Sequence, residues 1–135
     1  MSCHNIGRGL NHVVKKIIEL YDENKISKEV AINLIVRARD AVVVCDGNEY
    51  EAVDCIFDRR CGGCLEEVKT VDIFELSNEL DIDSLFFELW RKISDNFTHW
   101  CLCKECFYNI IDKQIENKEL SEKIKLEFEH IISNN

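Results

Sequence analysis

Apolar residues recur every three or four positions along most of the chain, a spacing that places them on one face of an α-helix. Asp22-Glu23-Asn24 interrupts the first such segment, and Ser27 then offers a side-chain oxygen as the N-cap of a second helix. The two faces consist of Leu10, Val13, Val14, Ile17, Ile18 and Tyr21 in the first segment and of Ala31, Leu34, Ile35, Ala38, Val42 and Cys45 in the second.

Turn and capping signals predict three further helices in the middle of the chain. Asp46-Gly47 is typical of a turn, and Asn48-x-x-Glu51 is a capping-box pattern for a helix that ends near Arg60. Asp72-x-x-Glu75 repeats this pattern and predicts a short helix, and a longer helix follows Asp81. The apolar face of the longer helix consists of Phe86, Leu89, Trp90, Ile93 and Phe97.

Two more helical faces complete the chain, so the pattern predicts six or seven short helices. Only Val42-Val43-Val44 resembles a strand, and it continues the face of the second helix. The sequence therefore predicts an all-α fold, a single compact domain over residues 1–135 in which residues 1–9 form a flexible lead. The last two faces are Phe107, Ile110, Ile111 and Ile115, and then Leu120, Ile124, Phe128 and Ile131.

Composition favours the same class of fold and a cytoplasmic location. The chain has no proline and only five glycines, and 46% of its residues are hydrophobic, enough for a core. Its first residues lack the pattern of a secretory signal, and no apolar run approaches the ~20 residues that span a bilayer. We therefore expect a cytoplasmic protein without a membrane segment.

The eight cysteines are interpreted in the light of that location. In a reducing compartment, Cys-x-x-Cys pairs indicate metal binding or redox chemistry more often than disulfides. Cys61-Gly62-Gly63-Cys64 and Cys103-Lys104-Glu105-Cys106 are two such pairs, and each can turn both of its sulfurs toward one tetrahedral ion. The sequence predicts that these four cysteines bind one structural zinc ion.

The residues around the two pairs suit thiolate ligands. Glycines in the first pair allow backbone amides to point at the sulfurs, and Cys106 falls in the first turn of a predicted helix, whose N-terminus favours negative charge. Arg59, Arg60 and Lys104 lie beside the pairs in sequence and could offset the charge of a four-thiolate site. In ligand spacing alone, this layout resembles treble-clef and zinc-ribbon sites, although residues 65–102 are predicted to form helices where those folds have a β-hairpin.

Other assignments of the cysteines remain open. Cys101, Cys103 and Cys106 with one remote cysteine could bind an iron–sulfur cluster, and Cys101 could replace Cys103 as a zinc ligand. A chain without any metal is a further alternative, because cysteine is a common core residue, and Cys45 and Cys55 fit helix packing. We expect His4 and His99 at the surface, yet a second metal site could use Cys3, His4, Cys45, His99 or Cys101.

Charge and motifs narrow the function classes. Residues 1–39 hold seven Lys and Arg against four Asp and Glu, and residues 40–135 hold ten against twenty-two, for a net charge of −9. Residues 70–93 resemble the helix-turn-helix of many bacterial DNA-binding domains, but Asp81 stands at the usual glycine and the second helix opens with acidic and aromatic residues. Such a surface repels phosphate and suits a protein partner better than nucleic acid.

No catalytic motif is apparent, and a zinc ion with four thiolates has no open coordination position. The sequence therefore favours a non-enzymatic zinc-binding module for protein interaction or regulation. The alternative is an iron–sulfur or thiol-based redox sensor that regulates transcription through residues 70–93.

Overall fold

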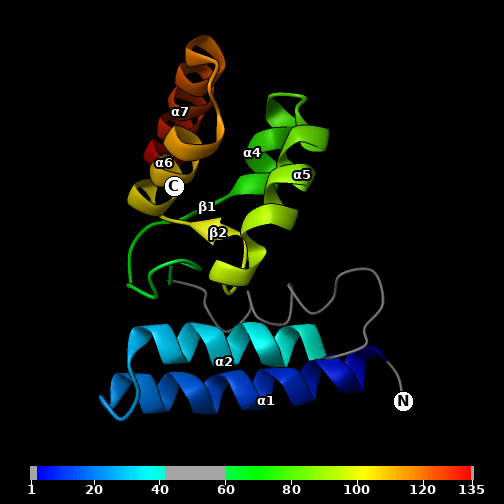
Figure 1. Cartoon of the computed structure of the whole chain (residues 1–135), viewed down its shortest axis with the longest axis vertical. Helices are drawn as coiled ribbons and strands as arrows, with labels where there is room; N and C mark the ends of the chain where they lie inside the picture. Colours follow the sequence, from blue (N-terminus) through cyan, green and yellow to red (C-terminus); the bar gives the residue numbers. More distant parts are fainter. Residues whose placement is uncertain (1–2, 42–59, 135) are drawn as a thin grey trace.

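The structure is a computed structural model that describes residues 3–41 and 60–134, with the backbone alone for residues 3–8 (Figure 1). Within these ranges the chain forms six α-helices, a short 3₁₀ helix and two strands of two residues each, which confirms the prediction of a mostly helical protein. The helix predicted after Asn48, the strand-like Val42-Val43-Val44, and Cys45 and Cys55 lie outside the described residues.

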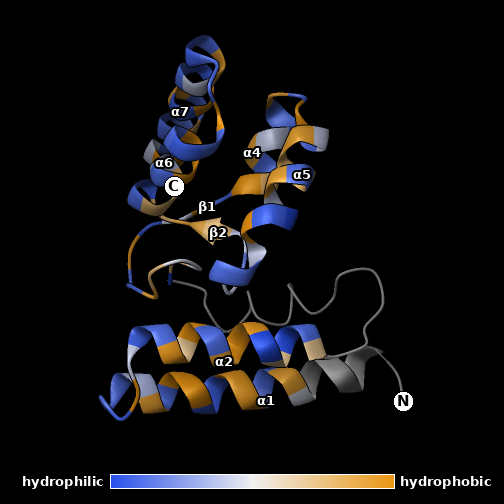
Figure 2. Ribbon diagram, viewed as in Figure 1, coloured by the Kyte–Doolittle hydropathy of each residue, from blue (hydrophilic) through white to orange (hydrophobic). Residues whose placement is uncertain are grey.

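The N-terminal part of the chain is an antiparallel pair of helices, α1 (Cys3–Asp22) and α2 (Lys28–Ala41). Between them Asn24 adopts a positive φ of 61°, and the Ser27 hydroxyl accepts a hydrogen bond from the Val30 amide, as expected of an N-cap. Figure 2 shows apolar and polar residues alternating along both helices. Their apolar faces meet in a small core of Leu10, Val14, Ile17, Ala31 and Ile35.

The sequence predicts a flexible lead over residues 1–9, and in the structure residues 3–9 are helical, because α1 begins at Cys3. Each glycine in a helix costs only about 1 kcal/mol relative to alanine, and once a helix is nucleated every added residue gains a hydrogen bond. Gly7 and Gly9 are therefore tolerated near the N-terminal end of α1.

The middle of the chain forms a helix-turn-helix of α4 (Ile73–Glu79) and α5 (Asp83–Ile93). The Asp72 carboxylate accepts hydrogen bonds from the amides of Phe74 and Glu75, which confirms it as the N-cap of α4. In the turn, Asp81 has a φ of 56°, the conformation that glycine adopts most easily. The buried face of α5 contains Phe86, Leu89, Trp90 and Ile93, four of the five residues predicted for it.

The C-terminal part is a second helical pair, α6 (Lys104–Gln114) and α7 (Lys118–Ser133). Phe107 of α6 stacks on Phe128 of α7 with ring centroids 4.9 Å apart, and Phe86 of α5 lies 6.1 Å from Phe107. These three rings stand in the main core, to which α4, α5, α6 and α7 all contribute.

A small sheet joins the middle and C-terminal parts of the molecule. Strands β1 (Val71–Asp72) and β2 (Cys101–Leu102) pair antiparallel, with Val71 opposite Leu102. In Figure 1 this sheet lies between the α4–α5 pair and the α6–α7 pair. About thirty residues, mostly helical, lie between the two strands in the sequence. The pairing of the strands places β2 beside the segment Cys61–Cys64.

The α1–α2 pair is attached to the rest of the molecule by Arg39 and Leu65. The Arg39 side chain is 1% exposed and donates hydrogen bonds to the carbonyl oxygens of Ser94, Phe97 and Thr98, at 3.2, 2.8 and 3.3 Å. Leu65, which follows Cys64 directly, is buried in the core of the α1–α2 pair. The segment with the first cysteine pair is therefore part of two packing units.

None of the described helices has both the length and the apolar composition needed to cross a lipid bilayer.

Candidate metal centre

The first cysteine pair sits in a tight hairpin. The Cys61 amide donates to the Glu66 carbonyl and the Leu65 amide donates to the Cys61 carbonyl, each at 3.0 Å, while Arg60 pairs with Glu67. The chain reverses through Gly62 and Gly63, and Leu65 adopts a positive φ of 61°. This reversal places the sulfurs of Cys61 and Cys64 on the same side of the hairpin.

The second pair lies where β2 passes into α6. Cys103 is the N-cap residue of α6 with an extended backbone, and Cys106 lies in the first turn, as the sequence predicts. The N-terminus of a helix carries partial positive charge, so it favours the thiolate form of a nearby cysteine.

The structure brings the four predicted ligands together. The sulfurs of Cys61, Cys64, Cys103 and Cys106 all lie within 4.8 Å of one another, and those of Cys64 and Cys103 are 3.9 Å apart. A tetrahedron with Zn–S bonds of 2.3 Å has edges of about 3.8 Å. The four cysteines are therefore positioned to bind a single metal ion, and none of the five cysteine side chains in the described ranges forms a disulfide.

Hydrogen bonds to Cys61 favour its thiolate form. A hydrogen bond with the Cys106 thiol contributes most, and amides of Gly63 and Cys103 donate to the Cys61 sulfur at 3.3 Å each. Together they lower the pKa of Cys61 to about 4 although the side chain is fully buried. One of the four sulfurs is thus a thiolate at neutral pH before a metal arrives.

The opposite shift occurs at two of the other sulfurs. Burial, followed by the negative charges of Cys61 and Cys103, raises the pKa of Cys64 to about 11. The hydrogen bond that Cys106 makes to Cys61, together with burial, raises the pKa of Cys106 well above its usual range. Without a cation, Cys64 and Cys106 therefore retain their protons, and a bound metal ion would replace these protons.

The two glycines allow the hairpin to approach the loop before β2. The Gly62 amide donates to the Cys101 carbonyl, and the Gly62 carbonyl accepts from both the amide and the hydroxyl of Thr98. A Cβ on Gly62 would overlap the carbonyl oxygen of His99, and one on Gly63 would meet the Phe97 ring. Residue 62 must therefore be glycine for the two halves of the site to meet.

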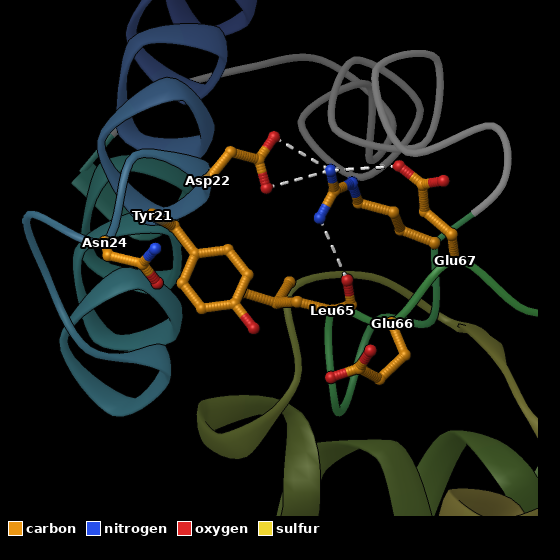
Figure 3. Close-up of a pocket in the computed structure, with 7 residues that line it drawn as sticks. Tyr21, Asp22, Asn24, Leu65, Glu66 and Glu67 are labelled. Atoms are coloured by element: carbon orange, nitrogen blue, oxygen red, sulfur yellow. Dashed lines mark hydrogen bonds and ion pairs between the residues drawn. The ribbon is translucent and has the colours of Figure 1, made fainter.

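Arg60 anchors the hairpin to the end of α1, and Figure 3 labels its partners Asp22, Leu65 and Glu67 and marks the interactions with dashed lines. Its guanidinium donates to both carboxylate oxygens of Asp22, to Glu67 and to the Leu65 carbonyl. Lys104 pairs with Glu129 at 2.6 Å. Arg60 and Lys104, which are expected from the sequence to offset the thiolate charge, are thus paired with carboxylates. Backbone N–H donors and the N-terminus of α6 face the sulfurs instead.

The remaining residues considered as ligands do not join this group. Cys101 lies in β2 outside the four-sulfur cluster, and its amide donates to Nδ1 of His99 at 3.1 Å. The expectation that His99 lies at the surface is wrong, because the side chain is fully buried. The side chains of Cys3 and His4 lie outside the described part of the chain.

Sequence reasoning missed the loop Phe97–His99, which forms the surface against which the glycine hairpin packs. Thr98 and His99 are both fully buried and polar, and no periodic pattern marks such residues. The one available signal was the pair of adjacent glycines, which indicates that another piece of backbone comes close.

Comparison of the chain with protein-family models, with curated proteins and with solved structures gives no match. The geometry of the four cysteines is therefore the main indication of function.

Proposed function

We propose that the protein is a zinc-binding module in which one ion, bound by four cysteines, holds distant parts of the chain together so that the module can bind another protein. The observation that carries this proposal is the mutual distance of at most 4.8 Å among the sulfurs of Cys61, Cys64, Cys103 and Cys106. Two pairs separated by about forty residues reach that distance only in the folded chain.

Zinc is the metal that this donor set favours. Four thiolates in a compact tetrahedron are typical of structural zinc, and they leave no coordination position for a substrate. An iron–sulfur cluster separates its cysteine ligands by several irons and bridging sulfides. Sulfurs as close as those of Cys64 and Cys103, at 3.9 Å, suit a single ion better.

The exposed face of α5 supports a protein partner rather than nucleic acid. Phe87 is 56% exposed and packs against Phe74 with ring centroids 5.0 Å apart, and Glu88 beside it is exposed. In a DNA-binding helix-turn-helix this helix would enter the major groove, where an acidic and aromatic surface repels phosphate. The expected result is no binding of random duplex DNA at low salt, measured by fluorescence anisotropy.

The decisive experiment combines elemental analysis with spectroscopy on protein purified without oxygen in a reducing buffer. Colourless protein with one zinc per chain supports the proposal, and visible absorbance with stoichiometric iron supports the redox-sensor alternative. Removal of the metal by a chelator should lower the melting temperature, because metal-binding energy contributes directly to folding. A metal-loaded protein whose melting temperature is unaffected by chelation would contradict the structural role.

A further inference from the structure

A pocket of about 420 Å³ adjoins one of the four sulfurs. It lies between the glycine hairpin, the end of α5 with the turn that follows it, and the outer face of α6. The residues that define its chemistry are Gly63, Phe97, Cys106, Asn109, Ile110 and Lys113.

The four sulfurs differ in how far solvent can reach them. Cys61 is fully buried and Cys103 is 8% exposed, whereas Cys64 and Cys106 are only partly buried. Of the two accessible cysteines, Cys106 is a wall residue of the pocket. Cys64 is not a wall residue of the pocket, and the carboxylates of Glu66 and Glu67 beside it are held in ion pairs with Lys28 and Arg60.

The pocket walls favour a particular class of small molecule. Lys113 supplies a positive charge and Asn109 an amide, while Phe97 and Ile110 supply apolar surface. A volume of about 420 Å³ falls within the usual range for small-molecule sites. A small anionic molecule with a metal-binding group fits this combination.

We propose that this pocket is the port through which the metal is loaded and removed, that it takes a small anionic chelator, and that Cys106 is the ligand exchanged there. In the removal step, a donor atom of the chelator would form a bond to the ion, and the bond from the ion to the Cys106 sulfur would break with its electron pair left on the sulfur. The resulting thiolate would take a proton from water, which leaves a hydroxide ion in the solvent. No oxidation state changes. This inference rests on the proposed metal site.

The test measures metal removal from protein loaded with Co²⁺, whose sulfur-to-metal absorption disappears as the ion leaves. Asn109→Trp fills the pocket and should slow removal by excess EDTA several-fold, while Asn109→Ala widens it and should accelerate removal. Asn78→Trp is the matched control, because Asn78 is an exposed asparagine of α4 outside the pocket wall and away from the four cysteines. Its removal rate should equal that of the unmodified chain.

A charge substitution tests the preference for an anion. Lys113→Gln should slow removal by EDTA, an anion, and leave removal by the neutral chelator 1,10-phenanthroline unchanged. Lys118→Gln, at an exposed lysine outside the pocket, should change neither rate. Equal slowing by both lysine substitutions would indicate a general charge effect and overturn the assignment of the pocket.

Two further outcomes separate the failure of this inference from failure of the metal site. A chain that does not take up one metal ion fails the proposed function itself. A chain that binds one ion, but in which the Asn109 variants and Asn78→Trp release it at the same rate, overturns the port alone. Slowing by Glu66→Trp in place of Asn109→Trp would assign the exchange to Cys64 and likewise overturn it.

Discussion

Several groups around the four cysteines together stabilise a buried thiolate at Cys61. Amides of Gly63 and Cys103 donate to the Cys61 sulfur, and Cys106 lies in the first turn of α6. Hydrogen bonds to a charged group are worth about 1.5–3 kcal/mol each, so this arrangement stabilises a thiolate that burial alone would protonate. Hydrogen bonds from the Cys106 thiol and then from backbone amides, more than nearby lysines or arginines, stabilise the Cys61 thiolate.

Replacement of Gly62 tests the close contact between the hairpin and the loop before β2. Gly62→Ala places a methyl group against the His99 carbonyl, and overpacking of this kind costs about 3 kcal/mol. Gly9→Ala is the control, because nothing lies near its Cβ, and an exposed helical glycine gains about 1 kcal/mol on becoming alanine. Urea unfolding of the metal-loaded protein should show the two opposite changes in the free energy of unfolding. Equal stability of the two variants would mean that the contact does not exist.

Metal binding should depend steeply on pH. At neutral pH Cys61, with its pKa of about 4, is a thiolate, whereas Cys64, with a pKa of about 11, and Cys106, whose pKa is also raised, are protonated. A divalent ion must displace at least the protons of Cys64 and Cys106, so the apparent affinity should fall by about 100-fold or more for each pH unit lost between pH 8 and pH 6. Calorimetric titrations in buffers with different ionisation enthalpies measure the released protons directly. Heats of binding that do not vary with the buffer would contradict these pKa directions.

At the scale of elements, the helices were predictable and the connections between them were not. Helical faces such as that of α5, and caps such as Ser27 and Asp72, are encoded in a few neighbouring residues. Strands β1 and β2 have two residues each, too short for a period of two to be visible in the sequence. The pairing of Val71 with Leu102 brings the two cysteine pairs close together. Because the two residues are far apart in the sequence, no pattern in neighbouring residues predicts their contact.

The burial of Arg39 is a second feature of this kind. Its position, four residues after Ile35 and eight after Ala31, falls on the buried face of α2, where the sequence offers no partner for a charge. Only the structure shows the guanidinium enclosed by the carbonyls of Ser94, Phe97 and Thr98. Isolated charged side chains are rarely buried unless several partners surround them. The residue therefore acts as a link between α2 and the loop behind the metal centre.

Removal of that link should weaken the molecule strongly. Arg39→Met keeps the length of the side chain but leaves the enclosed carbonyls without their donor, at an expected cost of about 2–4 kcal/mol in the free energy of unfolding. Arg37→Met, at an exposed position of the same helix, should change stability by about 0.5 kcal/mol or less. Chemical denaturation of both variants measures the difference. If the two variants unfold at the same denaturant concentration, Arg39 does not attach the helical pair.

On the scale of the whole molecule, the candidate metal centre lies where the α1–α2 pair, the loop that follows α5 and the start of α6 meet. The glycine hairpin inserts Leu65 into the α1–α2 core, its backbone contacts the loop that follows α5, and its sulfurs face the start of α6. Cys64 and Leu65 are adjacent, so the position of one sulfur depends on how well the helical pair is packed. Metal binding and packing against the α1–α2 pair should therefore both stabilise the same conformation of the hairpin.

Such coupling is reciprocal and can be measured from either side. Leu65→Ala removes a fully buried side chain from the α1–α2 core, at an expected cost of about 2–4 kcal/mol, and should also weaken zinc binding in a competition titration. Leu34→Ala, at a leucine of α2 that is 41% exposed, should leave the zinc affinity unchanged. In the reverse direction, removal of zinc should increase hydrogen exchange in α1 and α2 as well as around the cysteines. A Leu65→Ala protein that is less stable but binds zinc with full affinity would show that the helical pair and the metal centre fold as independent units.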